Sequence, residues 1–176
     1  MEMHYLDGPP SCDFDCGRDE QNSFFFDRAW SDSCRSISVT HVLYVKGIMA
    51  AYVTLMNDRI QLGPRERAKG VTYQLVPAIK LAQLGVDMRF AGNGVGKQMV
   101  AYAIETSRRY RGVVGCRYVT LDASPDLVAW YEGQGFVANK EEQRHREQLA
   151  AERGRPIDAL PRSMRFDLRD VRDPAG

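Results

Sequence analysis

A glycine-rich turn between an apolar run and a helical pattern constrains this chain more than any other stretch. The apolar run, residues 78–86, is short enough to be one buried strand. Residues 89–97 then read RFAGNGVGK, and the apolar face of the helical pattern that follows carries Met99, Val100, Ala103 and Ile104. Glycines let backbone N–H groups approach an anion, and a helix N-terminus adds aligned dipoles. The sequence therefore predicts a strand, an anion-binding turn and a helix start in succession.

The spacing of the glycines separates this turn from two other phosphate-binding motifs. A dinucleotide-binding turn needs G-x-G-x-x-G and a later acidic residue, whereas the glycines here follow G-x-G-x-G. A Walker loop needs Ser or Thr after Gly-Lys, but Gln98 follows Lys97. At this point an ordinary strand-to-helix turn with permissive glycines stays open as an alternative.

Composition indicates a globular protein. The 176 residues suit one domain with a sizeable core, and 44% of them are hydrophobic and 27% charged. The net charge of +1 argues against a general polyanion binder. The apolar stretches are too short to span a bilayer, and residues 1–11 lack the pattern of a signal peptide. We therefore expect a cytoplasmic protein without a membrane association.

Cysteine and histidine usage does not predict a metal site. The four cysteines (Cys12, Cys16, Cys34 and Cys116) form no C-x-x-C pair, and the three histidines are scattered. A structural zinc site needs clustered ligands at short spacings. We expect no metal, and free, mostly buried thiols in a reducing compartment.

The first third of the chain predicts a leader and a helix. Residues 1–13 contain the breaker Gly-Pro-Pro and are expected to be irregular. Asp15 is a suitable N-cap for a helix over residues 18–30. Its core face would carry Phe26 and Trp30.

A hairpin and a polar loop are expected next. Residues 37–43 and 48–55 are alternating or β-branched runs, joined by a short turn at Lys46 and Gly47. Residues 57–70 are polar and rich in arginine, which predicts an exposed basic loop, with a contact to a substrate phosphate as its alternative role.

Behind the glycine-rich turn, the helix should end near Tyr110 and a strand should cover residues 113–121. Ser124 is expected to be the N-cap of a further helix, with Pro125 at its first position. That helix should end at the glycines 133 and 135, and residues 136–137 should resume extended structure.

Three motifs resemble the GNAT N-acetyltransferases. Residues 89–94 (R-x-x-G-x-G) resemble the family's coenzyme A pyrophosphate motif, and residues 130–136 (WYEGQGF) resemble the motif that closes its fold. Residues 14–17 (FDCG) resemble the start of a subgroup that includes toxins of toxin–antitoxin modules. The resemblance covers residues 14–137, in the family's order. The order of the expected elements implies an α+β domain with a mixed, mostly antiparallel sheet flanked by helices. The resemblance adds a splay between its fourth and fifth strands.

The resemblance also implies acetyl-CoA as co-substrate. Acetyl transfer to an amine needs the thioester held beside a neutral amine, a donor for the oxyanion and a proton for the thiolate. Tyr131 would be the general acid, although packing in a core is its alternative role. No residue indicates a general base. The residues that would bind the coenzyme are Leu84, Gly85, Val86, Arg89, Phe90, Ala91, Gly92, Asn93, Gly94, Val95, Gly96, Lys97 and Ser124.

The chain departs from the toxin pattern after Phe136, where such toxins usually finish within one further strand. Residues 139–154 are highly charged and predict a helix inserted before a final strand at residues 164–168. A solvated arm is the default role of this helix, and a dimer element or a wall of the substrate site are the others.

Three functions stay open from the sequence. The first is an acetyl-CoA-dependent N-acetyltransferase that acts on a primary amine. The second is a toxin that acetylates aminoacyl-tRNA and is held inactive by an antitoxin protein. The third is a non-catalytic domain that binds acyl-CoA.

Overall fold

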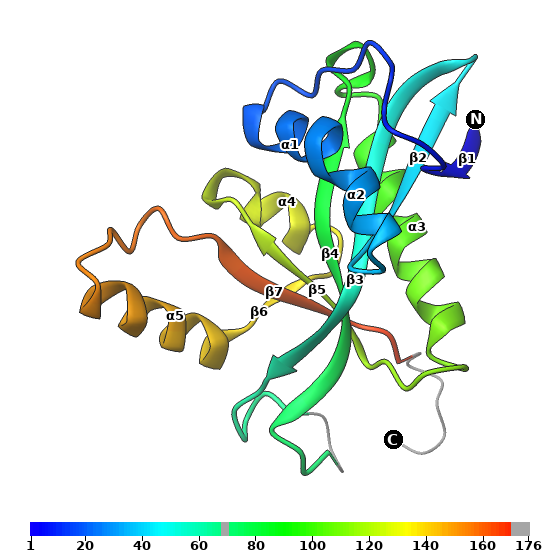
Figure 1. The fold of residues 1–176 in the computed structure, drawn as a ribbon. Helices are drawn as coiled ribbons and strands as arrows, with labels where there is room; N and C mark the ends of the chain where they lie inside the picture. The colour runs from blue at the N-terminus through cyan, green and yellow to red at the C-terminus, as the bar shows by residue number, and fades with distance from the viewer. Residues whose placement is uncertain (68–70, 170–176) are drawn as a thin grey trace. The chain divides into compact units, whose positions relative to one another are not determined.

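The computed structural model describes residues 1–67 and 71–169 (Figure 1). These residues divide into two compact units. Unit 1 contains Met1–Asn57 and Leu81–Thr106, and unit 2 contains Asp58–Lys80 and the residues from Ser107 onward. Strands β3 (Ile48–Gln61) and β4 (Leu75–Val86) and helix α3 (Val95–Tyr110) each contribute residues to both units. Whether the chain is a single domain stays a prediction.

In unit 1 the strands follow the order β1-β2-β3-β4. Strand β1 (Glu2–Tyr5) pairs antiparallel with β2 (Val39–Val45), and β2 pairs antiparallel with β3. The predicted hairpin is confirmed, and Lys46 and Gly47 close it with positive φ angles of 52° and 77°. The prediction of an irregular leader over residues 1–13 is wrong at its beginning, because strand β1 pairs with β2 as an edge strand.

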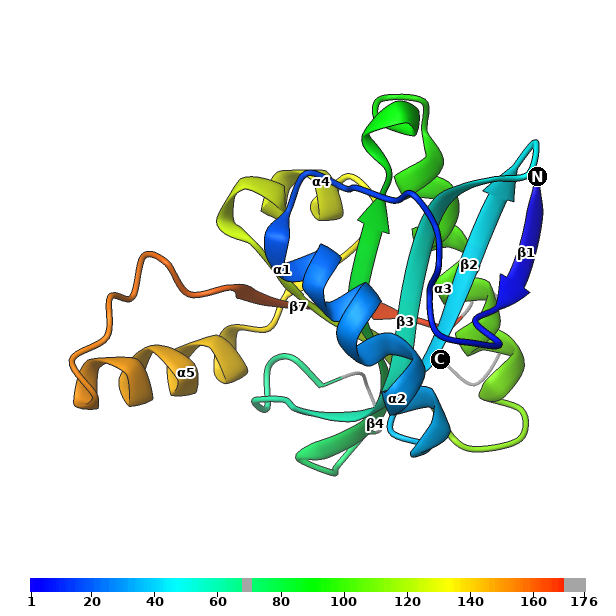
Figure 2. The same ribbon diagram turned by 45° about the horizontal axis from the view of Figure 1, so that its top comes forward.

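Helices lie on both faces of the unit 1 sheet (Figure 2). On one face, α1 (Asp19–Ser23), the π-helical turn η1 (Phe24–Arg28) and α2 (Ala29–Cys34) follow one another without a break. On the other face lies α3, and its Tyr102 hydroxyl is 2.8 Å from Nδ1 of His41 on β2. The core between the sheet and η1 contains Phe14, Phe25, Ala29, Val42, Met49 and Tyr52.

The π-helical turn corrects the predicted core face of this helix. A π turn holds more residues than an α turn, so the faces shift along the sequence. Phe25 and Ala29 are buried, whereas Phe26 is 38% exposed and Trp30 is only half-buried. Asp15 is not the N-cap either, because the helix begins at Asp19.

Unit 2 contains the strand order β3-β4-β5-β7-β6. Strand β5 (Tyr118–Ala123) pairs parallel with β4 and antiparallel with β7 (Arg162–Asp167), and β6 (Val137–Ala138) pairs antiparallel with β7. A mixed, mostly antiparallel sheet is thereby confirmed. The three β4–β5 pairs run from Ala78–Tyr118 to Lys80–Thr120.

Two predicted boundaries in unit 2 are wrong. The predicted basic loop begins as strand, since β3 runs to Gln61 and both Ile60 and Leu62 are buried. Residues 68–70 of that loop lie outside the described residues. The predicted strand at residues 113–121 starts late, at Tyr118, because residues 113–114 belong to an exposed turn after α3.

The helices of unit 2 follow the predicted order. Pro125 opens the 3₁₀ turn η3 (Pro125–Leu127), and α4 (Val128–Glu132) follows it. Ser124 occupies the N-cap position, but its side chain makes no capping hydrogen bond. Helix α5 (Lys140–Glu152) joins β6 to β7, which confirms the helical insertion between the last two strands (Figure 1).

The cysteine side chains are more exposed than the sequence predicted. Cys12 and Cys34 are exposed, and Cys16 and Cys116 are half-buried, so the prediction of mostly buried thiols is wrong. Within residues 1–67 and 71–169, no helix is both long and apolar enough to cross a bilayer.

Candidate functional site

The glycine-rich turn follows β4 in unit 1. The 3₁₀ turn η2 (Met88–Phe90) comes first, and α3 begins at Val95. Gly92 and Gly94 have φ angles of +77° and +79°, a backbone conformation that side chains with a Cβ rarely adopt. These two glycines are therefore required by the backbone of the turn.

The start of α3 presents backbone amides that the helix does not use. The hydrogen bond from Gln98 N to Gly94 O, 3.1 Å long, is the first of the helix. As in any α-helix, the amides before it, those of Val95, Gly96 and Lys97, have no intrahelical acceptor. Residues 91–94, which precede these amides in the chain, are exposed. Aligned amides, an accessible turn and a helix dipole together fit a pyrophosphate group.

Asp87, which the sequence did not predict, organises this turn. Its side chain is 3% exposed and accepts a forked pair of bonds from Arg89, with Nε–Oδ1 at 2.7 Å and Nη2–Oδ2 at 2.8 Å. The hydrogen bond from Arg89 lowers the pKa of Asp87 to about 2, against the opposing effect of burial. Asp87 is therefore ionised at neutral pH, and it fixes the side chain of Arg89.

The FDCG segment lies against the same turn. The Met88 amide donates to the Asp15 carbonyl at 2.9 Å, and the Asp15 amide donates to Oδ2 of Asp87 at 3.2 Å. The Asp15 carboxylate accepts from the Gly17 amide and from Asn22 Nδ2, both at 2.7 Å. The FDCG segment, which the sequence marked only as a family motif, is therefore bound to the turn by hydrogen bonds.

The end of β4 carries Leu84, Gly85 and Val86, three of the residues predicted to bind the coenzyme. Leu84 and Val86 are half-buried, and Gly85 is buried. A Cβ on Gly85 would lie 2.4 Å from Cε1 of Tyr52 and 3.2 Å from Cζ of Phe14. A glycine is therefore needed here for packing, and the strand end rests directly on two core aromatic rings.

Tyr131, the predicted general acid, lies in α4 of unit 2. It is 6% exposed and makes edge contacts with Trp130 and Phe136, at centroid distances of 4.8 and 5.7 Å. Its carbonyl accepts from the amides of Gln134 and Phe136, which closes the turn after the helix. The neighbouring Glu132 is exposed. The predicted coenzyme-binding residue Ser124 is half-buried after β5 in the same unit.

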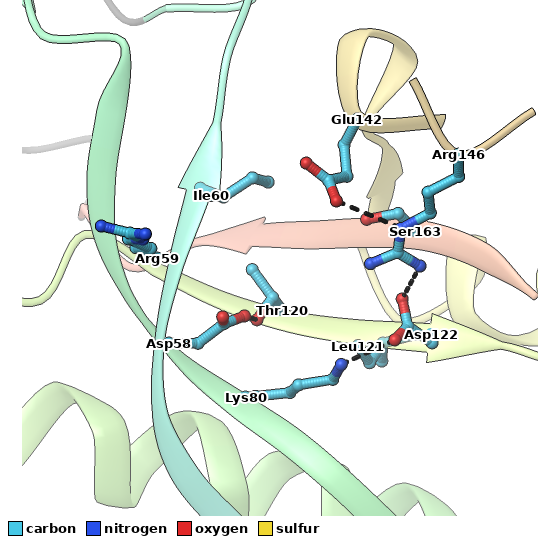
Figure 3. A pocket seen from close by; sticks show the side chains of 10 residues that line it. All are labelled: Asp58, Arg59, Ile60, Lys80, Thr120, Leu121, Asp122, Glu142, Arg146 and Ser163. Atoms are coloured by element: carbon cyan, nitrogen blue, oxygen red, sulfur yellow. Dashed lines mark hydrogen bonds and ion pairs between the residues drawn. The ribbon is translucent and has the colours of Figure 1, made fainter. Parts of the chain in front are cut away.

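A small polar pocket of about 60 Å³ lies on the sheet of unit 2 beside α5 (Figure 3). Asp122 binds Lys80 at 2.6 Å and Arg146 at 2.5 Å, and Arg146 also binds Glu142 at 3.1 Å. Burial acts to raise the pKa of Asp122, but Lys80 and Arg146 outweigh it and lower the pKa. These charges satisfy one another, so the cluster is a junction between β4, β5 and α5.

A second junction holds the start of α5. The Glu66 carboxylate accepts from the amides of Lys140 and Glu141, at 2.8 and 3.0 Å, and pairs with Arg165 at 3.2 Å. Asn139 is fully buried, with Nδ2 donating to Ser163 Oγ at 2.9 Å and Oδ1 accepting from Arg165 at 2.7 Å. The default expectation of a solvated arm is therefore wrong for the first turn of this helix.

Comparison with known proteins identifies the family. The profile described as "Acetyltransferase (GNAT) domain" matches residues 28–150. The chain therefore belongs to the GNAT acetyltransferases. A search of curated proteins found no significant match.

Solved structures of similar fold include toxins of toxin–antitoxin modules. A mutant of KacT superposes with a TM-score of 0.73 at 18% identity, covering 95% of this chain and 94% of that one. A mutant of the toxin AtaT, bound to acetyl-CoA and the C-terminus of the antitoxin AtaR, gives 0.69 at 18% identity, with coverages of 95% and 92%. AtaT complexed with acetyl-methionyl-tRNAfMet gives 0.70 at 21% identity, with coverages of 78% and 86%. At these identities, the likeness establishes the fold.

Proposed function

We propose that this chain is an acetyl-CoA-dependent N-acetyltransferase that transfers the acetyl group to a primary amine by direct attack on the thioester. Family membership supports the acetyltransferase activity. The observation that carries the coenzyme assignment is the turn of unit 1, where two glycines with positive φ precede the open amides of α3. Residues 89–97 would hold the pyrophosphate, mainly through backbone amides, and Leu84, Gly85 and Val86 would meet the pantetheine arm. Ser124 is a further candidate contact of the coenzyme.

The reaction requires one bond to form and one to break. The neutral amine attacks the thioester carbonyl carbon, and a backbone N–H stabilises the oxyanion of the tetrahedral intermediate. The C–S bond then breaks, the nitrogen loses its proton to water, and the thiolate takes a proton from a general acid. The products are an amide and free coenzyme A.

Tyr131 is our candidate for that general acid, because it occupies the tyrosine position of the matching motif. We expect Tyr131→Phe to lower kcat by about 100-fold or more without weakening acetyl-CoA binding. Thiol release with a panel of primary amines measures kcat, and calorimetric titration measures the affinity. An unchanged kcat would remove Tyr131 from the chemistry and leave it a packing residue.

A narrower candidate function is a toxin that acetylates the α-amine of aminoacyl-tRNA. It is supported by the fold likeness to AtaT in complex with acetyl-methionyl-tRNAfMet and to AtaT bound to the C-terminus of AtaR. An α-amine has a pKa near 8, against about 10.4 for lysine, so it needs no strong base at neutral pH. An antitoxin protein would then be a partner.

Expression in a bacterial host tests the toxin function. Growth arrest that Tyr131→Phe abolishes would support it, together with acetylation of charged tRNA in vitro. Harmless expression of an enzyme shown to be active on small amines would count against it. Tight acetyl-CoA binding without transfer to any acceptor would instead favour a non-catalytic acyl-CoA-binding domain.

A further inference from the structure

Arg89 is expected to face the coenzyme pyrophosphate, but both sides of its guanidinium already have partners. The inner side makes the forked contact with Asp87. On the outer side, Nη1 lies 3.2 Å from Oδ2 of Asp13, and Nη2 donates to the Asp13 carbonyl at 2.5 Å. One arginine therefore stands between two aspartates of very different exposure.

The buried aspartate cannot turn away from Arg89. Its carboxylate also accepts from the Arg89 amide at 2.9 Å and from the Asp15 amide at 3.2 Å. Its own amide donates to the Ala50 carbonyl of β3 at 2.9 Å. Asp87 is thus fixed from both ends, and it fixes the direction of the guanidinium and the position of the FDCG segment.

The exposed aspartate is held far less firmly. The side chain of Asp13 is 95% exposed, and the Arg89 side chain is 44% exposed. Solvent-exposed ion pairs contribute little free energy, whereas a forked bond to a buried carboxylate is strong and directional. An anion with more charge than a carboxylate would displace Asp13 from Arg89 and leave the bond to Asp87 in place.

We propose that Asp87 is a positioning residue that aims Arg89 at the coenzyme pyrophosphate, and that Asp13 is an exchangeable internal anion that a phosphate oxygen replaces. This inference rests on the proposed function, because it assigns the pyrophosphate to the turn. A merely structural Asp87 would affect every thioester equally. A positioning Asp87 acts only on ligands that carry the pyrophosphate.

The test compares acetyl-CoA with S-acetylpantetheine, which has the same thioester but no pyrophosphate. We expect Asp87→Asn to weaken acetyl-CoA binding about tenfold, because the forked charge-assisted contact is lost, and to leave S-acetylpantetheine unchanged. Arg89→Lys keeps the charge but loses the fork, so it should show the same selectivity. Equal losses for both thioesters would overturn the proposal.

Asp13→Asn should change acetyl-CoA affinity in the direction opposite to Asp87→Asn. Removing the competing charge should tighten acetyl-CoA binding about two- to threefold, because an exposed ion pair no longer has to break. Since Asp13 is exposed, this variant is expected to fold normally even where Asp87→Asn does not. Weaker binding by Asp13→Asn would contradict the exchange.

The control is Asp122→Asn, which removes a carboxylate bound to Lys80 and Arg146 in unit 2. It should lower thermal stability without changing the ratio of the two affinities. If the wild type binds no acetyl-CoA, the proposed function itself fails. If the wild type binds it but Asp87→Asn behaves like Asp122→Asn, only the positioning role fails.

Discussion

The N-termini of helices α5 and α3 differ in what lies against their partial positive charge. At the start of α5, the Glu66 carboxylate accepts from the first amides, and the end is closed by the chain itself. At the start of α3, glycines 92 and 94 shape an exposed turn, and among the described residues no side chain is bound to the amides of Val95, Gly96 and Lys97. Both ends carry the same partial positive charge, which the Glu66 carboxylate neutralises at α5 and for which we propose the coenzyme pyrophosphate at α3.

The largest expected effect comes from removing a contact that holds the start of α5. Asn139→Ala should lower the free energy of unfolding by about 2–3 kcal/mol, because Ser163 and Arg165 lose a buried partner. Urea titration measures this loss. Asn57→Ala, at an exposed position of β3, is the control and should change stability by less than about 0.5 kcal/mol. A similar small change for Asn139→Ala would mean that α5 is not held at its start.

The next effect concerns the carboxylate that caps α5. Burial would raise the pKa of Glu66, but the amides of Lys140, Glu141 and Gly63 and the charge of Arg165 lower it. A pKa lowered by folding stabilises the protein above the unfolded value near 4.3, and this contribution disappears as pH falls through the folded pKa. Glu66→Gln should therefore cost about 1–2 kcal/mol at pH 7 and progressively less below pH 4.

Urea unfolding of wild type and Glu66→Gln at pH 7, 5, 4 and 3 checks this dependence. The difference between the two proteins is the quantity of interest, because other carboxylates titrate in both. A difference that stays constant down to pH 3 would mean that Glu66 is not ionised against the start of α5.

The smallest effect would make the open end resemble the closed one. Asn93→Asp places a carboxylate beside the start of α3 at an exposed position, without changing a glycine. Acetyl-CoA affinity should fall about three- to tenfold, because the new charge repels phosphate, while stability should change by only a few tenths of a kcal/mol. Calorimetric titration at low salt measures the affinity. Gln148→Glu in α5 adds the same charge in unit 2 and should leave affinity unchanged.

Local patterns predicted the open end well. Glycine spacing, the apolar run before it and the helical periodicity after it are all short-range signals, so β4, the turn and α3 were located from the sequence. The hairpin at Lys46 and Gly47 and the inserted helix were predicted for the same reason.

Long-range contacts could not be predicted in this way. Glu66 reaches amides more than 70 residues further along the chain, and no local pattern marks it as their cap. The sequence carried a weak signal for the Asp87–Arg89 ion pair. An acidic residue directly after a buried strand needs a partner, and Arg89 is two residues further along the chain. No sequence signal indicated that Phe25 faces the core, because a π-helical turn depends on packing that helix propensities do not describe.

The most direct test of the open helix end is thermal unfolding with and without acetyl-CoA, for wild type and Gly94→Asp. At 100 times its dissociation constant the coenzyme should stabilise the wild type by about 2.7 kcal/mol. Gly94→Asp should lose that stabilisation, because its backbone is strained at a positive φ and its carboxylate repels phosphate. Equal stabilisation of both proteins would place the coenzyme elsewhere, and no stabilisation of the wild type would contradict the proposed function.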